Sequence, residues 1–140
     1  MSLGSVNHIG IATKSIESAM QLWQALGFTL EKESTVEEQG VKVGYLSGSG
    51  YTRIELLEPL GESTPVGRFI KNRGAGVQQI AVDVDDIEKC MAKLLDLGVI
   101  LVNDEPLIGS EGNRIAFIHP SSCGGVLVEI VEKKLDNNQK

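Results

Sequence analysis

The chain has 140 residues, a formal net charge of −6 and a pI near 4.9. This length is enough for one compact domain with a core, and the negative charge argues against nucleic acid and anionic membranes as main partners. No apolar run approaches the roughly 20 residues that cross a bilayer, and two cysteines without a CxxC motif favour a reducing cytoplasm over secretion.

The first structured element is predicted at residues 6–12, "VNHIGIA", after a stretch (1–5) that reads as an expression-tag remnant without a secretory signal. Apolar and polar residues alternate here as in a half-buried β-strand. Ile9 and Ile11 share one face, and His8 lies on the other.

A helix is predicted after this strand. Ser15 is a residue type that caps helix N-termini, and Gly27 stands where the left-handed residue after a helix is wanted. Apolar side chains recur with helical spacing between them at Ile16, Ala19, Met20 and Trp23.

Further strands are predicted at 41–47 and 52–58, followed by a linking helix at 63–74. Ser63 would cap this helix, Pro65 would occupy its first turn and Gly74 would end it.

The beginning of the chain then returns as "VQQIAVDVDDIEKCM", displaced by 71 positions (79 − 8 = 71 for Gln79 and His8). A strand is therefore predicted at 77–84, followed by a helix with Asp86 as its cap and Gly98 after its end. Cys90 lies on the apolar stripe of this helix, which favours a packing role over a reactive one.

The remainder repeats the first half with a displacement of 74, because "LVEIVE" answers "RIELLE" and Glu129 answers Glu55. Strands are predicted at 100–102, 114–119 and 125–132. The sequence thus predicts an α+β protein of paired βαβββ modules, which form a curved mixed sheet around a metal-binding cleft. The predicted boundaries are one domain at 6–132, repeats at about 6–60 and 77–132, and a polar tail at 133–140.

Four polar residues occupy repeat-related positions in otherwise apolar strands. If the two modules pair, their side chains can point into one cleft, where two carboxylates, an imidazole and an amide suit a divalent ion. The alternative is a structural histidine and solvent-facing glutamates on edge strands. The four residues are His8, Glu55, Gln79 and Glu129.

These motifs resemble the vicinal-oxygen-chelate superfamily and, within it, the methylmalonyl-CoA epimerases. The resemblance covers about 6–132, and its most specific part is the C-terminal stretch. The segments that carry it are "NHIGIAT", "RIELLEPLGESTPVGRFI", "GAGVQQIAVDVDDIE" and "NDEPLIGSEGNRIAFIHPSSCGGVLVEIVE".

The resemblance implies that His8, Glu55, Gln79 and Glu129 are metal ligands. Family members usually have a second histidine where this chain has Gln79, and a neutral amide oxygen is a weaker partner than imidazole for zinc or nickel. The implied cofactor is therefore a divalent ion, with cobalt, manganese, magnesium, nickel and zinc all open. Some members also place a glutamate where this chain has Val43.

The activity that the resemblance implies is epimerisation of methylmalonyl-CoA by removal of the C2 proton through an enolate. Such chemistry requires Lewis-acid stabilisation and groups on both sides of the carbon. Glu129 matches the family's ligand-and-base glutamate, and Glu55 is the symmetric candidate for the second base.

Four further residues are candidates for substrate binding. Asn113 and Arg114 can hold a carboxylate or a phosphate, although a plain surface turn is the alternative. Ser121 and Ser122 lie in "HPSSCGG", whose backbone N–H groups and hydroxyls can meet an anion. The histidine of this motif is expected to order the loop, and Cys123 has no basic partner that would activate it.

Two other functions remain open on the same fold. A glyoxalase I-type lactoylglutathione lyase needs a similar metal and proton shuttle. A metal-poor ligand-binding protein of the bleomycin-resistance type would accommodate Gln79 and Val43. For the epimerase, the expected partners are a small acyl-CoA substrate and a second copy of the chain in a homodimer.

Overall fold

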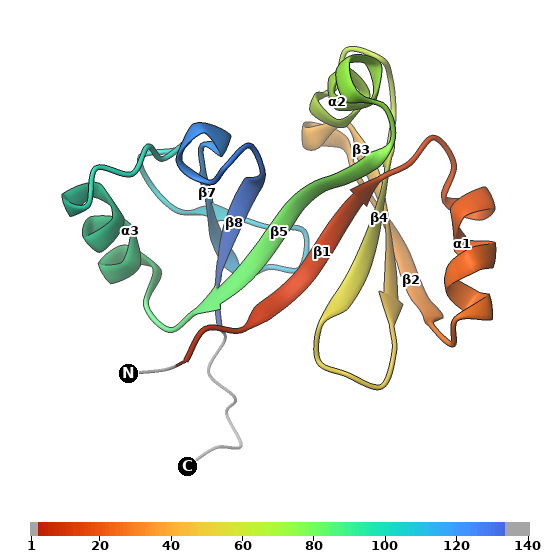
Figure 1. Ribbon diagram of the computed structural model, residues 1–140, viewed down its shortest axis with the longest axis horizontal. Coiled ribbons are helices and arrows are strands. Elements are labelled where there is room, and N and C mark those ends of the chain that lie inside the picture. The colour runs from red at the N-terminus through yellow and green to blue at the C-terminus, as the bar shows by residue number, and fades with distance from the viewer. Residues whose placement is uncertain (1–2, 134–140) are drawn as a thin grey trace. The chain divides into compact units, whose positions relative to one another are not determined.

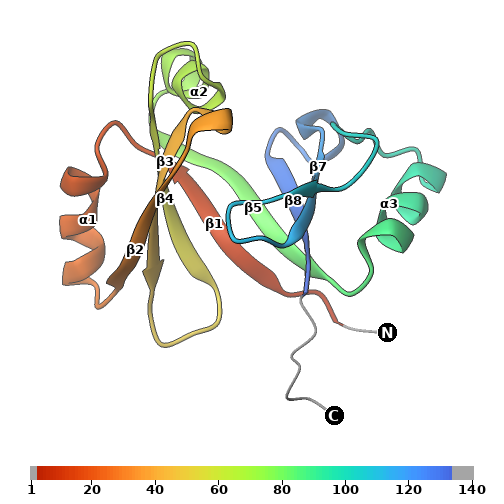
Figure 2. The same ribbon diagram turned by 180° about the vertical axis from the view of Figure 1, so that it is seen from behind.

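The computed structural model describes residues 3–133 in two compact units, seen from opposite sides in Figures 1 and 2. The N-terminal unit is Asn7–Ile80, and the C-terminal unit is the described chain from Ala81 onward with the residues before Asn7. Residues 134–140 of the predicted tail, and 1–2 of the predicted tag remnant, lie outside the described residues. No helix within 3–133 is long and apolar enough to cross a membrane.

The N-terminal unit is one βαβββ module followed by a helix. Its strands β1 and β4 run parallel, and β2–β3 and β3–β4 run antiparallel, in the order β2-β3-β4-β1 followed by the first part of β5. Its elements are β1 (Val6–Ala12), α1 (Ile16–Ala25), β2 (Thr29–Val36), a 3-10 turn (Glu37–Gln39), β3 (Val41–Ser47), β4 (Arg53–Pro59) and α2 (Pro65–Arg73).

The C-terminal unit contains the second module. Strand β5 begins in the N-terminal unit and ends in this one, where the strand order is β5-β8-β7-β6 with β6–β7 and β7–β8 antiparallel. Its elements are β5 (Gly76–Val84), α3 (Ile87–Asp96), β6 (Leu107–Ile108), β7 (Arg114–Ile118), a 3-10 turn (Pro120–Ser122) and β8 (Leu127–Glu132). The predicted α+β class and the two βαβββ modules are confirmed.

The structure differs from the prediction in several local features. Strands β2 (Thr29–Val36) and β6 (Leu107–Ile108) were not among the predicted strands. The predicted strand at 100–102 is a single antiparallel bridge from Leu101 to Ile118, flanked by backbone hydrogen bonds from Val102 to Phe117 and from His119 to Ile100. The linking helix is capped by Thr64 instead of Ser63, and it ends at Gly74 as predicted.

The helices of the two modules begin alike. The Ser15 side chain accepts from the N–H of Ser18 at 3.2 Å, and Asp86 accepts from Lys89 at 3.1 Å, so both predicted caps are confirmed. A second carboxylate, from the last strand of each module, reaches the first helical N–H. Glu58 accepts from Ile16 at 2.8 Å, and Glu132 accepts from Ile87 at 3.0 Å.

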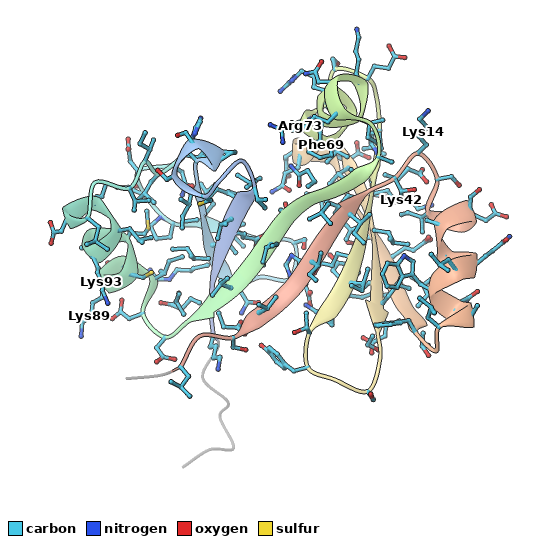
Figure 3. All side chains as sticks on the ribbon, in the orientation of Figure 1. Lys14, Lys42, Phe69, Arg73, Lys89 and Lys93 are labelled. Carbon is cyan, nitrogen blue, oxygen red and sulfur yellow. The ribbon has the colours of Figure 1, made fainter. Side chains whose placement is uncertain are left out.

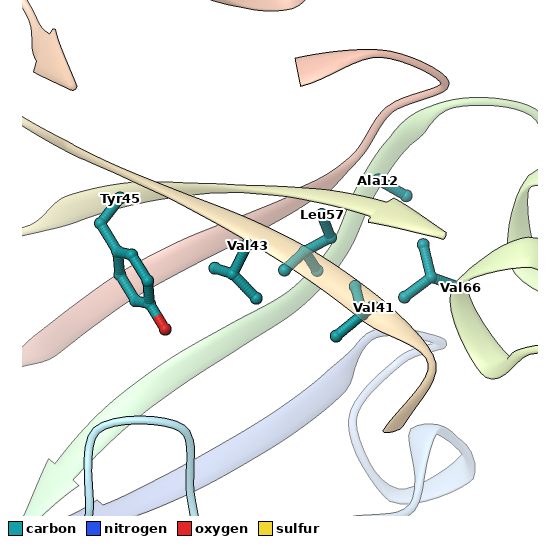
Figure 4. Packing of buried hydrophobic residues seen from close by; sticks show 6 residues of the cluster. All are labelled: Ala12, Val41, Val43, Tyr45, Leu57 and Val66. Carbon is teal, nitrogen blue, oxygen red and sulfur yellow. The ribbon is translucent and has the colours of Figure 1, made fainter. Parts of the chain in front are cut away.

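Each sheet has one face under a helix. In the N-terminal unit, the outer face packs on α1, as the predicted alternation requires. The opposite face carries a second cluster that extends to α2 and ends at the Tyr45 ring (Figure 4). Six buried side chains form this cluster, namely Ala12, Val41, Val43, Tyr45, Leu57 and Val66.

Candidate active site

His8, Glu55 and Gln79 meet on the Tyr45-bearing face of the N-terminal unit. The Nδ1 atom of His8 lies 3.2 Å from Oε2 of Glu55 on β4, and its Nε2 atom lies 3.3 Å from Nε2 of Gln79 on β5. His8 and Glu55 are each only 5% exposed. The repeat predicted that positions 8 and 79 lie on neighbouring strands, and this contact confirms it.

The two ring nitrogens of His8 face different partners. Nδ1 is 2.7 Å from the Asn7 side-chain oxygen as well as 3.2 Å from the Glu55 carboxylate. Two acceptors at one nitrogen require that Nδ1 carries the proton. The lone pair of Nε2 then accepts from the Gln79 amide, so the imidazole presents this nitrogen as its ligating atom.

These three residues fit a divalent ion in chemical type. An ion bound at His8 Nε2 would lie on the Gln79 side of the ring, and Gln79 would have to turn its amide oxygen toward it. Glu55 stands at the other nitrogen, where a carboxylate orients a ligating histidine. Within residues 3–133 no group of three or more His, Cys, Asp or Glu is placed to hold a metal.

Gly10 gives Gln79 its place beside His8. A Cβ atom at Gly10 would stand 2.6 Å from Cγ of Gln79 and 3.2 Å from Cδ1 of Leu57. A larger residue at this position would therefore push the Gln79 side chain away from the imidazole.

Glu129 belongs to the C-terminal unit, where it is 7% exposed on β8. Its partner in the strand register is Phe117, just as Glu55 is opposite Tyr45 in the N-terminal unit. The two glutamates therefore occupy equivalent positions in the two modules, as the repeat predicted. The roles predicted for them remain predictions.

The predicted substrate residues Asn113 and Arg114 make contacts within their own unit. Asn113 donates to the carbonyl of Glu132 at 2.9 Å. Arg114 donates to both carboxylate oxygens of Glu132 at 2.9 Å and to Glu88 at 2.6 Å. The Arg114 guanidinium lowers the pKa of the Glu132 carboxyl, with help from the Ile87 N–H. A substrate contact by Arg114 stays a prediction.

The loop after β7 is ordered by its own side chains. His119 Nδ1 accepts from the N–H of Ser121 at 3.0 Å, which confirms the loop-ordering role predicted for this histidine. Ser122 Oγ accepts from the N–H of Ile100 at 3.0 Å. Substrate contacts by both serines remain predictions. Burial raises the pKa of the Cys90 and Cys123 thiols, which favours the inert reading of both.

Three residues of functional interest, two in the N-terminal unit and one in the C-terminal unit, did not emerge from the sequence. Arg53 Nη2 lies 3.7 Å from Glu55 Oε2. The Tyr45 hydroxyl is 3.0 Å from Ser34 Oγ. Asp83 is a further buried carboxylate, 8% exposed, in the C-terminal unit. Strand alternation places Arg53 on the face of Glu55 and was a usable signal, whereas the burial of Asp83 depends on tertiary packing.

The Glyoxalase/Bleomycin resistance protein/Dioxygenase superfamily profile matches residues 7–117. The mitochondrial methylmalonyl-CoA epimerase of Dictyostelium discoideum is 36% identical over 135 residues, which cover 95% of this chain and 81% of that protein. The chain belongs to the methylmalonyl-CoA epimerase family. An ethylmalonyl-CoA/methylmalonyl-CoA epimerase of Cereibacter sphaeroides is 35% identical, with 91% of this chain and 97% of that protein covered.

Solved structures support the same family and its vicinal-oxygen-chelate fold. A variant of Streptomyces coelicolor methylmalonyl-CoA epimerase, in complex with 2-nitronate-propionyl-CoA, has a TM-score of 0.86 and 37% identity. The match covers 96% of this chain and all of that one. The predicted resemblance to methylmalonyl-CoA epimerases is thereby confirmed.

Proposed function

We propose that this protein is an epimerase that interconverts the stereoisomers of methylmalonyl-CoA through an enolate at C2. The observation that carries the proposal is the contact of the buried His8 and Glu55 with each other and of His8 with the partly buried Gln79, in a chain of this family. The acyl group is a small 2-carboxyacyl thioester, since the named relatives include an enzyme for both ethylmalonyl-CoA and methylmalonyl-CoA.

Epimerisation requires proton removal on one side of C2 and proton return on the other. We assign these steps to Glu129 and Glu55, which are buried and occupy equivalent positions in the two modules. In the N-terminal unit the N–H of His8 at Nδ1 meets Glu55 and fixes its orientation.

The proposed cofactor is a divalent metal ion held by His8, Gln79 and Glu129, with Glu55 as a further ligand once its carboxylate turns from Nδ1 of His8 toward the ion. When bound, such an ion supplies Lewis-acid stabilisation of the negative charge that develops on the thioester oxygen. His8 contributes a preset tautomer, and Gln79 contributes a neutral oxygen after its amide turns. This mixed set of nitrogen and oxygen donors favours none of zinc, nickel, cobalt, manganese and magnesium strongly, so all five stay in the proposal.

Asn113, Arg114, Ser121 and Ser122 complete the proposed substrate contacts. Ser121 can contact a substrate without rearrangement, because it is exposed in the turn after His119. Arg114 could take part only through a guanidinium that already holds Glu132.

We also propose a cytoplasmic homodimer. Two free thiols among the described residues suit a reducing compartment. Exposed apolar side chains in the C-terminal unit offer surface for a second copy. They include Leu97, Ile100, Val102 and Ile108.

The glyoxalase I-type and bleomycin-resistance-type alternatives are less well supported. The relatives named above are epimerases of malonyl-type thioesters. The buried donors also argue against a cleft that only sequesters a ligand.

Deuterium exchange at C2 of methylmalonyl-CoA, followed by NMR with metal-replete protein, tests the proposal. The wild-type protein should exchange this proton and equilibrate the two stereoisomers. Glu38→Gln, a change at an exposed residue of the 3-10 turn, serves as the matched control and should behave as wild type. Absence of exchange with every divalent ion offered would remove the epimerase assignment.

A further inference from the structure

Two cations lie on the same face of the N-terminal unit as His8 and Glu55. Arg53 precedes Glu55 by two residues on β4, and in the parallel register it is the partner of His8. Its Nη2 atom lies 3.7 Å from Glu55 Oε2, and its side chain is 24% exposed. Lys32 on β2 is the register partner of Tyr45.

Both cations meet at the buried Tyr45 ring. Lys32 Nζ lies 5.0 Å from the ring centroid, and Arg53 Cζ lies 5.8 Å from it. The ring is attracted to positive charge over its face, so it holds the two side chains in place. Glu55 stands directly across from Tyr45 in the strand register. A positive region therefore borders the candidate active site on one side.

We infer that Arg53 binds the free carboxylate of the acyl group, with Lys32 adding to the positive potential around it. The inference rests on the proposed function, because it names what selects the 2-carboxyacyl class of substrate. A guanidinium presents two parallel N–H donors to a carboxylate, which an ammonium cannot do.

The reaction itself raises the value of such a contact. Removal of the C2 proton adds a negative charge to a substrate that already carries a carboxylate next to the reacting carbon. A cation placed at that carboxylate stabilises the transition state more than the ground state. Arg53 is therefore a substrate-binding residue that affects both affinity and rate.

Lys42 provides a matched cation that should have no such role. It is the register partner of Glu58 on β4, so strand alternation places it on the opposite face from Glu55 and Tyr45. Its Nζ atom lies 3.7 Å from Glu33, and its side chain is 37% exposed. Figure 3 labels this lysine at its place on the ribbon.

Malonyl-CoA and acetyl-CoA differ only by the carboxylate, so their binding by calorimetry isolates its partner. Arg53→Gln should weaken malonyl-CoA binding by about 10- to 100-fold, the range for a lost hydrogen bond to a charged group. Acetyl-CoA binding should change by less than about twofold, because Arg53 has no carboxylate to hold there. Arg53→Lys should lose less malonyl-CoA affinity than Arg53→Gln, and Lys42→Gln should alter neither ligand.

The competing explanation is that Arg53 acts only through its ion pair with Glu55. It predicts that Arg53→Gln weakens both ligands equally, and that result would overturn the inference. If Arg53→Gln fails to fold, Arg53→Lys provides the test. An unchanged ratio of malonyl-CoA to acetyl-CoA affinity in Arg53→Lys would then overturn the inference. Wild-type exchange at C2 together with either result leaves the proposed function standing, whereas absence of wild-type exchange removes both.

Discussion

The two units share the same pattern of cap and strand glutamates, and they differ in the side chains that surround this pattern. Each module uses a strand-end glutamate to accept the first N–H of its helix, Glu58 at Ile16 and Glu132 at Ile87. The next glutamate inward on that strand is opposite an aromatic residue in both units. The shared pattern therefore satisfies a requirement that both modules have, since the first N–H of each helix needs a hydrogen-bond acceptor.

The side chains around the strand glutamates differ between the two units. Around Glu55 the N-terminal unit carries His8, Arg53 and the Tyr45 hydroxyl, all polar. The equivalent face of the C-terminal unit carries the buried carboxylates Glu129 and Asp83, but most of it is an apolar cluster with Phe117 at its edge. Its members include Ala81, Ile115 and Val131. The C-terminal unit instead places its arginine at the cap, where Arg114 holds Glu132 and Glu88.

The largest expected effect concerns the two equivalent glutamates. Glu129→Gln keeps an oxygen donor of similar length but removes the base. Proton exchange at C2 should fall at least about 10²-fold with saturating metal, within the range for loss of a general base. Deuterium exchange measured by NMR checks this, with Glu38→Gln as the surface control.

Glu55→Gln should reduce exchange as well. Together the two variants distinguish a mechanism with two bases from one with a single base. With two bases, loss of either one leaves deuterium entry from only one enantiomer, whereas a single base would incorporate deuterium with retention. Near-normal epimerisation in both variants would contradict the assignment of either glutamate as a base.

The second prediction concerns the departure at Gln79. Gln79→His replaces an amide oxygen beside His8 by an imidazole nitrogen and should tighten zinc or nickel binding. An improvement of about tenfold corresponds to about 1.4 kcal/mol. Competition with a chelator measures the affinity. Gln78→His is the control, since its side chain leaves the strand on the other face. Equal or weaker binding after Gln79→His would show that position 79 is not a ligand.

The contact between His8 and Gln79 was predictable because the repeat has a fixed displacement and strands alternate their faces. The proton on Nδ1 was not, because it depends on Asn7 and Glu55 meeting the same nitrogen. Ser63 and Thr64 are equally suitable caps by residue type. In the structure Thr64 Oγ1 accepts from the N–H of Gly67 at 3.1 Å, and α2 packs so closely on the preceding turn that a Cβ at Gly67 would overlap the Gly61 carbonyl.

The third prediction concerns the glutamates that accept the first N–H of each helix. It tests whether Arg114, which holds Glu132 at the start of α3, adds stability that the start of α1 lacks. Arg114→Met should lower the free energy of unfolding at neutral pH, because the variant loses the hydrogen bonds from the guanidinium to Glu132 and Glu88. Lys42→Met, the equivalent change beside Glu58, should cost at most about 0.5 kcal/mol. Urea unfolding compares the two variants with wild type.

The pH dependence of this difference follows from the lowered pKa of Glu132. A carboxyl whose pKa falls on folding contributes stability above its unfolded pKa, about 4.3 for glutamate. That contribution is lost as the pH falls through the folded pKa. The gap between wild type and Arg114→Met should therefore shrink in acid, and a gap that stays constant down to low pH would contradict the ion-pair explanation.

The smallest expected effect compares two repeat-related amides, Asn7 and Gln78 (78 − 71 = 7). Asn7 has both ends engaged, with its oxygen 2.7 Å from His8 Nδ1 and its Nδ2 3.5 Å from the Tyr51 hydroxyl. The Gln78 oxygen is buried, and among the described residues it has no hydrogen-bond partner. A buried acceptor without a partner costs about 1–3 kcal/mol relative to a satisfied one. Gln78→Met removes this acceptor at similar volume and should stabilise the protein by about 0.5 kcal/mol. Asn7→Leu should destabilise it, because Nδ1 of His8 loses an acceptor. Thermal unfolding of both variants measures the contrast, and a loss of stability in Gln78→Met would mean that the Gln78 amide is satisfied by solvent.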